Sequence, residues 1–140
     1  MIFKDIAIYD KPLDIAVAGD LASSDGSGAL NIFAGYIRNK TKSKDVVRLD
    51  YEAYEPMALK VMTKIAEEAS QKWPIDKVVI HHRVGTLHVG EIAVIIAVST
   101  PHRRESFAAC QYIIDTLKLK VPIWKKEIFT DGEEWVSEHP

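Results

Sequence analysis

The feature that most constrains the fold is an unbroken apolar run of seven residues, 92–98. A run of this length is too short to cross a membrane as a helix, which needs about 20 residues. Its β-branched residues favour a strand, and a strand that is apolar at every position needs cover on both faces. The sequence therefore predicts a sheet that is packed on both sides.

Composition indicates one globular domain over residues 1–140. The chain has 140 residues, 47% of them apolar and 27% charged, which is enough to build a core without disulfides. A single cysteine excludes a disulfide framework, and a net charge of −2 gives no reason to expect a nucleic-acid partner. The N-terminus lacks the basic start and apolar run of a signal peptide, so we expect a cytoplasmic protein with no membrane segment.

Strand and helix patterns are mixed along the chain. Residues 47–53 alternate strictly, with Val47, Leu49 and Tyr51 on one face, which predicts a half-buried strand. Residues 39–44 contain no apolar residue and no glycine, and we expect an exposed, mobile loop there. We expect further strands over residues 2–8, 29–38 and 78–84, a turn over 84–90, and a hairpin over 124–136 around Thr130-Asp131-Gly132. Helices are expected to begin at Asp14, Pro56 and Thr100, and the second should end at the Trp73-Pro74 step. This mixture, with several antiparallel neighbours, predicts the α+β class.

The helix after Thr100 carries a lysine on its apolar side. At 100° per residue, Arg103, Phe107 and Lys118 lie close to one meridian of this helix. A lysine in such a position is partly desolvated, which makes its amine easier to deprotonate near neutral pH. The alternative is that Lys118 extends from the helix end and complements the helix dipole.

Basic residues gather in three islands on a slightly acidic chain: residues 38–48, 102–104 and 118–126. The three islands suggest a local anion site, although solvated surface lysines would give the same pattern. His102 and Arg103 stand where a helix begins, a position suited to anion binding.

Other chemistries have little support in the sequence. His81 and His82 are adjacent on a predicted strand, so their side chains point to opposite faces and do not share a metal easily. We expect no metal site, because neither a His-Glu-x-x-His helix nor a cysteine pair occurs. Cys110 has no activating neighbour in sequence and is interpreted as a small buried hydrophobe.

Several ordered motifs point to one family. The most specific block is residues 117–127, which read Leu-Lys-Leu-Lys-Val-Pro-Ile-Trp-Lys-Lys-Glu. Supporting blocks are residues 33–38, 49–58, 82–87, 90–91 and 102–103, followed by Asp131-Gly132 and Trp135. With these motifs the chain resembles the large, catalytic subunit of molybdopterin synthase, over about residues 28–136.

The resemblance implies a sulfurtransferase of molybdenum cofactor biosynthesis. Such an enzyme converts cyclic pyranopterin monophosphate to molybdopterin by adding the two dithiolene sulfurs, without a cofactor. The sulfur donor is a small ubiquitin-like subunit whose C-terminal Gly-Gly ends as a thiocarboxylate and threads into a pocket of the large subunit. The family fold is an α/β hammerhead with an additional antiparallel β-sheet, and the large subunits form a homodimer within a heterotetramer.

The family pattern also assigns roles to residues. Lys118 and Lys125 match the catalytic lysines, and Arg38, His102 and Arg103 match the anion and substrate contacts. The expected neighbours in the pocket wall are Tyr36, Ile37, Lys126 and Glu127. Three further residues are candidates either for an apolar wall of the tail groove or for the core: Pro122, Ile123 and Trp124.

The chain departs from the family in places, and two other classes stay open. The family often has a glycine after the position of Arg38, whereas residues 39–45 here have none, and Ser106 stands where a small apolar residue is common. One other class is a non-catalytic module that binds a phosphate-bearing ligand or RNA. It would need aromatic platforms beside the basic islands, and only Trp124 is near one in sequence. The other class is a structural α+β subunit without a site.

Overall fold

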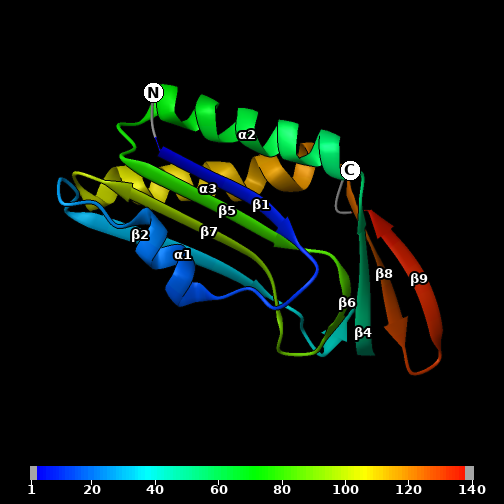
Figure 1. Ribbon diagram of the computed structural model, residues 1–140. Helices are drawn as coiled ribbons and strands as arrows, with labels where there is room; N and C mark the ends of the chain where they lie inside the picture. Colours follow the sequence, from blue (N-terminus) through cyan, green and yellow to red (C-terminus); the bar gives the residue numbers. More distant parts are fainter. Residues whose placement is uncertain (1–2, 138–140) are drawn as a thin grey trace.

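Two β-sheets meet at one end of a pair of long helices in the computed structural model, which describes residues 3–137 (Figure 1). The helices are α1 (Ile15–Ala22), α2 (Glu55–Lys72) and α3 (Arg103–Lys120). The strands are β1 (Phe3–Tyr9), β2 (Ala29–Tyr36), β3 (Lys40–Thr41), β4 (Lys44–Ala53), β5 (Lys77–Arg83), β6 (Gly85–His88), β7 (Ile92–Thr100), β8 (Ile123–Phe129) and β9 (Gly132–Ser137). This mixture confirms the α+β prediction.

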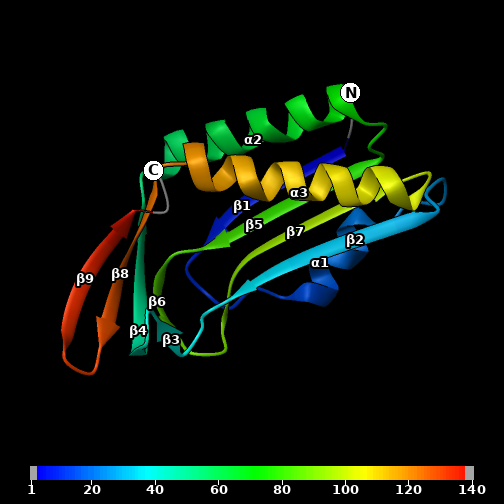
Figure 2. The ribbon, with the colours of Figure 1, turned by 180° about the vertical axis from the view of Figure 1, so that it is seen from behind.

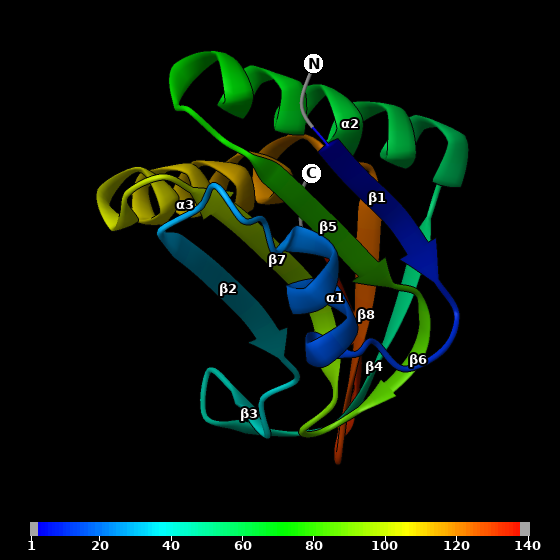
Figure 3. The same ribbon diagram turned by 60° about the vertical axis from the view of Figure 1, so that its left-hand side comes forward.

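The first sheet has the order β1-β5-β7-β2, with β1 parallel to β5 and the other pairs antiparallel. Helices α2 and α3 cover one face of this sheet, and α1 covers the other (Figures 2 and 3). Strand β7 is therefore enclosed from both sides, and every residue from Ala93 to Thr100 is buried. The prediction that residues 92–98 form a strand covered on both faces is confirmed.

Alternation along β7 and β5 supplies two separate cores. Ile96 and Val98 face α2 and α3 and join the larger cluster, whereas Ile95 and Ala97 face α1 with Ala18. Full burial of each Ile or Val side chain contributes about 1.5–3 kcal/mol to folding. The first sheet is thus a rigid central layer for the elements around it.

The second sheet is antiparallel, with the order β3-β4-β8-β9 and β6 paired to β4. Its strand β4 confirms the predicted strand, but Val46 is buried and Val47 is exposed. A register shift between Val46 and Arg48 explains the error, because a β-bulge resets the alternation of side chains. Leu49 and Tyr51 lie on the buried face as predicted.

Residues 39–44 are exposed as predicted, except for the half-buried Thr41, but residues 40, 41 and 44 belong to strands and not to a loop. Strands β3 and β4 form a tight hairpin whose turn residues, Lys42 and Ser43, have φ angles of 50° and 70°. Positive φ at both turn positions matches the right-handed twist of hairpin strands, although glycine and asparagine adopt it more readily. The Lys40 Nζ to Asp45 Oδ1 ion pair, 2.7 Å long, spans the hairpin.

Local sequence signals predicted most of the helix ends correctly. Asp14 caps α1 through its Oδ1, which accepts hydrogen bonds from the backbone of Ala16 at 2.9 Å and Val17 at 3.3 Å. Helix α2 ends at Lys72, before the Trp73-Pro74 step, as predicted. The predicted start of α3 was wrong, because β7 continues through Thr100 and His102 is the N-cap residue.

The expected turn over residues 84–90 contains the short strand β6. Beside β6, Arg83 Nη1 donates to Glu91 Oε2 at 2.8 Å, and the backbone N–H of His88 donates to Glu91 Oε1 at 2.7 Å. Together these hydrogen bonds hold the pKa of Glu91 below its usual value, with the His88 backbone contribution the larger. One carboxylate thus ties the ends of β5, β6 and β7 together.

Glu91→Gln is expected to lower the urea midpoint of unfolding at pH 7. Because the folded-state pKa of Glu91 is lowered, its ionised form stabilises the fold fully above the unfolded value of about 4.3. This stabilisation is lost as the pH falls through the folded-state value, so the gap between variant and wild type should shrink toward pH 3. Glu134→Gln, at an exposed site, is the control. An equal gap at both pH values would contradict the assignment.

Among the described residues, none of the helices combines the length and the hydropathy that a membrane crossing requires.

Candidate active site

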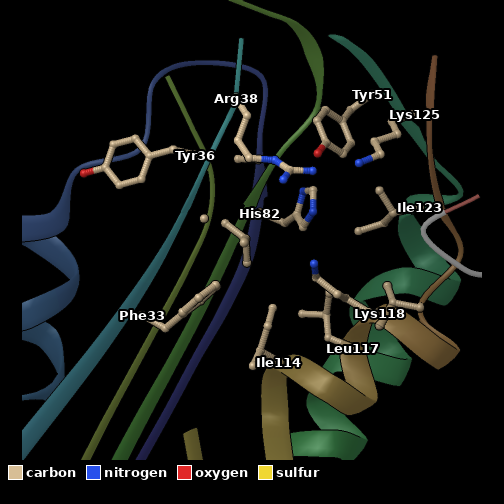
Figure 4. Close-up of a pocket in the computed structure, with 14 residues that line it drawn as sticks. Phe33, Tyr36, Arg38, Tyr51, His82, Ile114, Leu117, Lys118, Ile123 and Lys125 are labelled. Carbon is tan, nitrogen blue, oxygen red and sulfur yellow. The ribbon is translucent and has the colours of Figure 1, made fainter. Parts of the chain in front are cut away.

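A cavity of about 370 Å³ opens where the two sheets and the C-terminal end of α3 meet. We call it the junction cavity (Figure 4). It is lined by Phe33, Gly35, Tyr36, Arg38, Tyr51, His82, Ala93, Val94, Ile114, Leu117, Lys118, Val121, Ile123 and Lys125. Residues that are far apart in sequence therefore form one site.

Three cationic side chains reach the junction cavity from three different segments. Arg38 follows β2, Lys118 lies in the last turn of α3, and Lys125 lies on β8. Their charged groups point into the same space (Figure 4). This concentration of positive charge suits a ligand with several anionic groups.

Lys118 reaches the junction cavity by extending from the end of α3. Its side chain is exposed, so the prediction of a desolvated lysine was wrong. Leu117 and Ile114 supply the buried surface beside it. Phe107, which the helical wheel placed on the same stripe, is 58% exposed, because the buried face of α3 is centred on Ile113 and Leu117 and Phe107 lies beyond its edge.

Alternation along β8 places Lys125 on the cavity side with Ile123, while Trp124 and Lys126 point the other way. Of the three candidates for the apolar wall, only Ile123 lines the junction cavity, and Trp124 is 40% exposed. Lys126 instead lies on the opposite face of β8, 3.6 Å from Glu133 and over the Trp135 ring at 5.0 Å from its centroid.

The other predicted wall residues take different positions. The Tyr36 ring points away from the centre of the junction cavity, although the residue lines it (Figure 4). Ile37 is buried in the main core. Glu127 is buried too, and its Oε2 accepts a hydrogen bond from Thr41 Oγ1 at 2.7 Å, which joins β8 to the hairpin after Arg38.

His102 and Arg103 lie at the opposite end of α3 from Lys118, and both are exposed. Fifteen residues separate Arg103 from Lys118, which corresponds to about 22 Å of helix. Neither residue lines the junction cavity of its own chain. The structure therefore divides the predicted cations into a group at the cavity and a pair at the start of α3.

Two functional candidates were missed from the sequence, Tyr51 and His82. His81 and His82 do point to opposite faces, as predicted: His81 Nε2 lies 2.7 Å from Asp5 Oδ2, and His82 lines the junction cavity. The rings of Tyr51 and His82 meet edge to face at 5.3 Å. Both residues stand within the family-like blocks, which was the available signal; their proximity depends on how the two sheets pack.

Nucleophile and metal chemistry have no visible support in the described part of the chain. Burial raises the pKa of the Cys110 thiol to about 11, so the thiol stays protonated at neutral pH. Within residues 3–137, His, Cys, Asp and Glu side chains form no group of three or more that could hold a metal ion.

The fold and the junction cavity define an α+β protein with a polycationic site between two sheets. Residues 8–120 match the family model described as "MoaE protein". A molybdopterin synthase catalytic subunit from Nostoc sp. is 50% identical over 133 residues, which cover 94% of this chain and 81% of the relative. The chain belongs to the MoaE family, which confirms the family resemblance.

Solved structures agree with this assignment. The crystal structure of molybdopterin synthase from Staphylococcus aureus has a TM-score of 0.89 and 40% identity, covering 93% of this chain and 95% of that one. A complex of subunits 1 and 2 of molybdopterin-converting factor from Helicobacter pylori contains a chain with a TM-score of 0.75 and 18% identity, covering 97% and 91% of the two chains. The second likeness concerns the fold alone.

Proposed function

We propose that this chain is the catalytic subunit of a molybdopterin synthase, which converts cyclic pyranopterin monophosphate to molybdopterin. The observation that carries the proposal is the convergence of Arg38, Lys118 and Lys125 on one cavity in a member of the MoaE family. The substrate carries a phosphate and the sulfur donor a thiocarboxylate. Both anions gain from cations that the fold has already brought together.

The two lysines take different roles in this proposal. Lys118 acts as general acid and base beside the bound pterin, since an ammonium group can give a proton and take it back. Lys125 is half-buried and supports the developing negative charge from the other side of the junction cavity. Arg38 binds an anionic group of the substrate or donor, where its planar guanidinium can form paired hydrogen bonds.

The sulfur donor is proposed to be a small ubiquitin-like subunit with a C-terminal Gly-Gly thiocarboxylate. An extended tail of small residues can enter a cavity between two sheets that a globular face cannot. We also propose that two copies of this chain form a homodimer within a heterotetramer. A monomeric mass by light scattering, measured on this chain at micromolar concentration, would contradict the dimer.

Reconstitution tests the proposed function directly. The chain is mixed with thiocarboxylated small subunit and cyclic pyranopterin monophosphate, and the dithiolene product is measured after conversion to a fluorescent derivative. We expect product that depends on all three components. Tight precursor binding without product would favour a non-catalytic binding module instead.

Removing charge from the anion contacts is expected to weaken binding. Arg38→Ala and Arg103→Ala should each raise the dissociation constant for the precursor or the small subunit by about tenfold, roughly the effect of losing a charge-assisted hydrogen bond. Added salt should weaken wild-type binding and affect the variants less. Titration calorimetry checks both effects, with the exposed Lys64→Ala as control. A lower maximal rate with unchanged binding in Arg103→Ala would contradict the role of Arg103.

A further inference from the structure

His82 is a buried titratable group of the junction cavity to which the proposed chemistry gives no role. It lies on β5, it is 4% exposed, and it lines the cavity between the two sheets. Its register partners on the flanking strands are Ile8 on β1 and Val94 on β7. An imidazole held in this apolar layer is surrounded by rigid structure on the sheet side.

The orientation of the ring follows from one hydrogen bond. His82 Nδ1 lies 2.8 Å from the backbone oxygen of Arg83. Since a carbonyl oxygen only accepts, Nδ1 carries the proton, and in the neutral ring the basic lone pair belongs to Nε2. Nε2 is at the end of the ring remote from the backbone, and the ring projects among the cavity residues (Figure 4).

Groups from several elements face His82 in the junction cavity. Arg38, Lys118 and Lys125 approach the same space from three segments, and Tyr51 packs against the ring from β4 at 5.3 Å. A neutral imidazole with its proton fixed on Nδ1 is the arrangement that a general base requires.

We propose that His82 is the general base that activates the water that releases the small subunit from the sulfurated substrate. The inference rests on the proposed function. When the thiocarboxylate sulfur bonds to a substrate carbon, the carbonyl carbon of the donor stays attached to that sulfur as a thioester. Water adds to this carbonyl carbon as one of its protons passes to Nε2 of His82.

The step closes without any oxidant or reductant. The carbon–sulfur bond of the tetrahedral adduct breaks, and the electron pair leaves on sulfur, which takes the proton back from Nε2. The small subunit departs with a carboxyl group, which ionises and loses its proton to solvent. One water molecule is consumed for each sulfur retained on the substrate, and His82 returns to its starting state.

Single-turnover mixing of the full chain, the thiocarboxylated small subunit and the precursor tests the proposal. His82→Asn keeps an N–H donor near the Arg83 oxygen but has no base. We expect this variant to accumulate a covalent adduct of small subunit and pterin, seen by intact-protein mass spectrometry, with release slowed about 100-fold. His81→Asn is the matched control, since His81 is equally buried but faces α1, and it should release product at the wild-type rate.

Two results would overturn the role of His82 and leave the proposed function intact. One is normal release without adduct in a folded His82→Asn variant. The other, which needs no variant, is wild-type release in 18O-labelled water that leaves no label in the C-terminal carboxyl group of the small subunit, because the proposed step places a water oxygen there. A wild-type chain that forms neither adduct nor dithiolene would instead overturn the proposed function, and the role of His82 with it.

Discussion

Lys118→Ala is expected to reduce dithiolene formation at least about 100-fold, the usual cost of losing a general acid or base. Lys118 extends from the last turn of α3 into the junction cavity, and its side chain is exposed. Truncation therefore removes an amine and no core packing. The free energy of unfolding and the affinity for the small subunit should stay close to wild type. Single-turnover product yield, a denaturation curve and a binding titration with the small subunit measure these three quantities for each variant.

Two companion variants sharpen this test. Lys118→Arg should fail as well, because a guanidinium keeps its proton at neutral pH and cannot act as a base. Lys120→Ala removes an exposed lysine from the same turn of α3 and should leave turnover unchanged. Near-normal turnover in Lys118→Ala would end the assignment, and full activity in Lys118→Arg would reduce the role of Lys118 to charge alone.

A small subunit shortened by its two C-terminal residues is expected to support no sulfur transfer, while it still binds through its globular face. Two residues of extended chain span about 7 Å, so the shortened tail stops well short of the cations. The decisive control is a shortened subunit that carries a thiocarboxylate at its new end, because it separates reach from chemistry. Dithiolene formation from that control would contradict a tail that threads into the junction cavity.

Elements with local signals could be predicted from the sequence. Asp14 and the Trp73-Pro74 step set helix ends through backbone capping and proline sterics, and both act within a few residues. The errors occurred where pairing with a neighbouring strand determines the local structure. The bulge after Val46 depends on pairing with β8, and Thr100 stays in a strand because it pairs with Ala29 of β2.

The same distinction applies to the site. Lys118, Lys125 and Arg38 could be identified from motifs, and the structure brings them to one cavity. The contact between His82 and Tyr51 could not be predicted, since the two residues lie on strands of different sheets and only the packing of one sheet on the other brings their rings together. The helical wheel also could not predict the burial of Lys118. It gives the direction in which the side chain points, but not whether that end of α3 packs on the sheet.

The walls of the junction cavity come from both sheets, so a bound ligand also holds the two sheets together. Any anion that contacts Arg38 beside the first sheet and Lys125 on the second binds only while the two sheets stay docked. By linkage, a free ligand concentration of 100 times the dissociation constant adds about 2.7 kcal/mol to the free energy needed to separate the two sheets. Hydrogen exchange in β8, which is remote in sequence from β2, should therefore slow when the precursor binds. The slower exchange would measure how far the ligand holds the two sheets together.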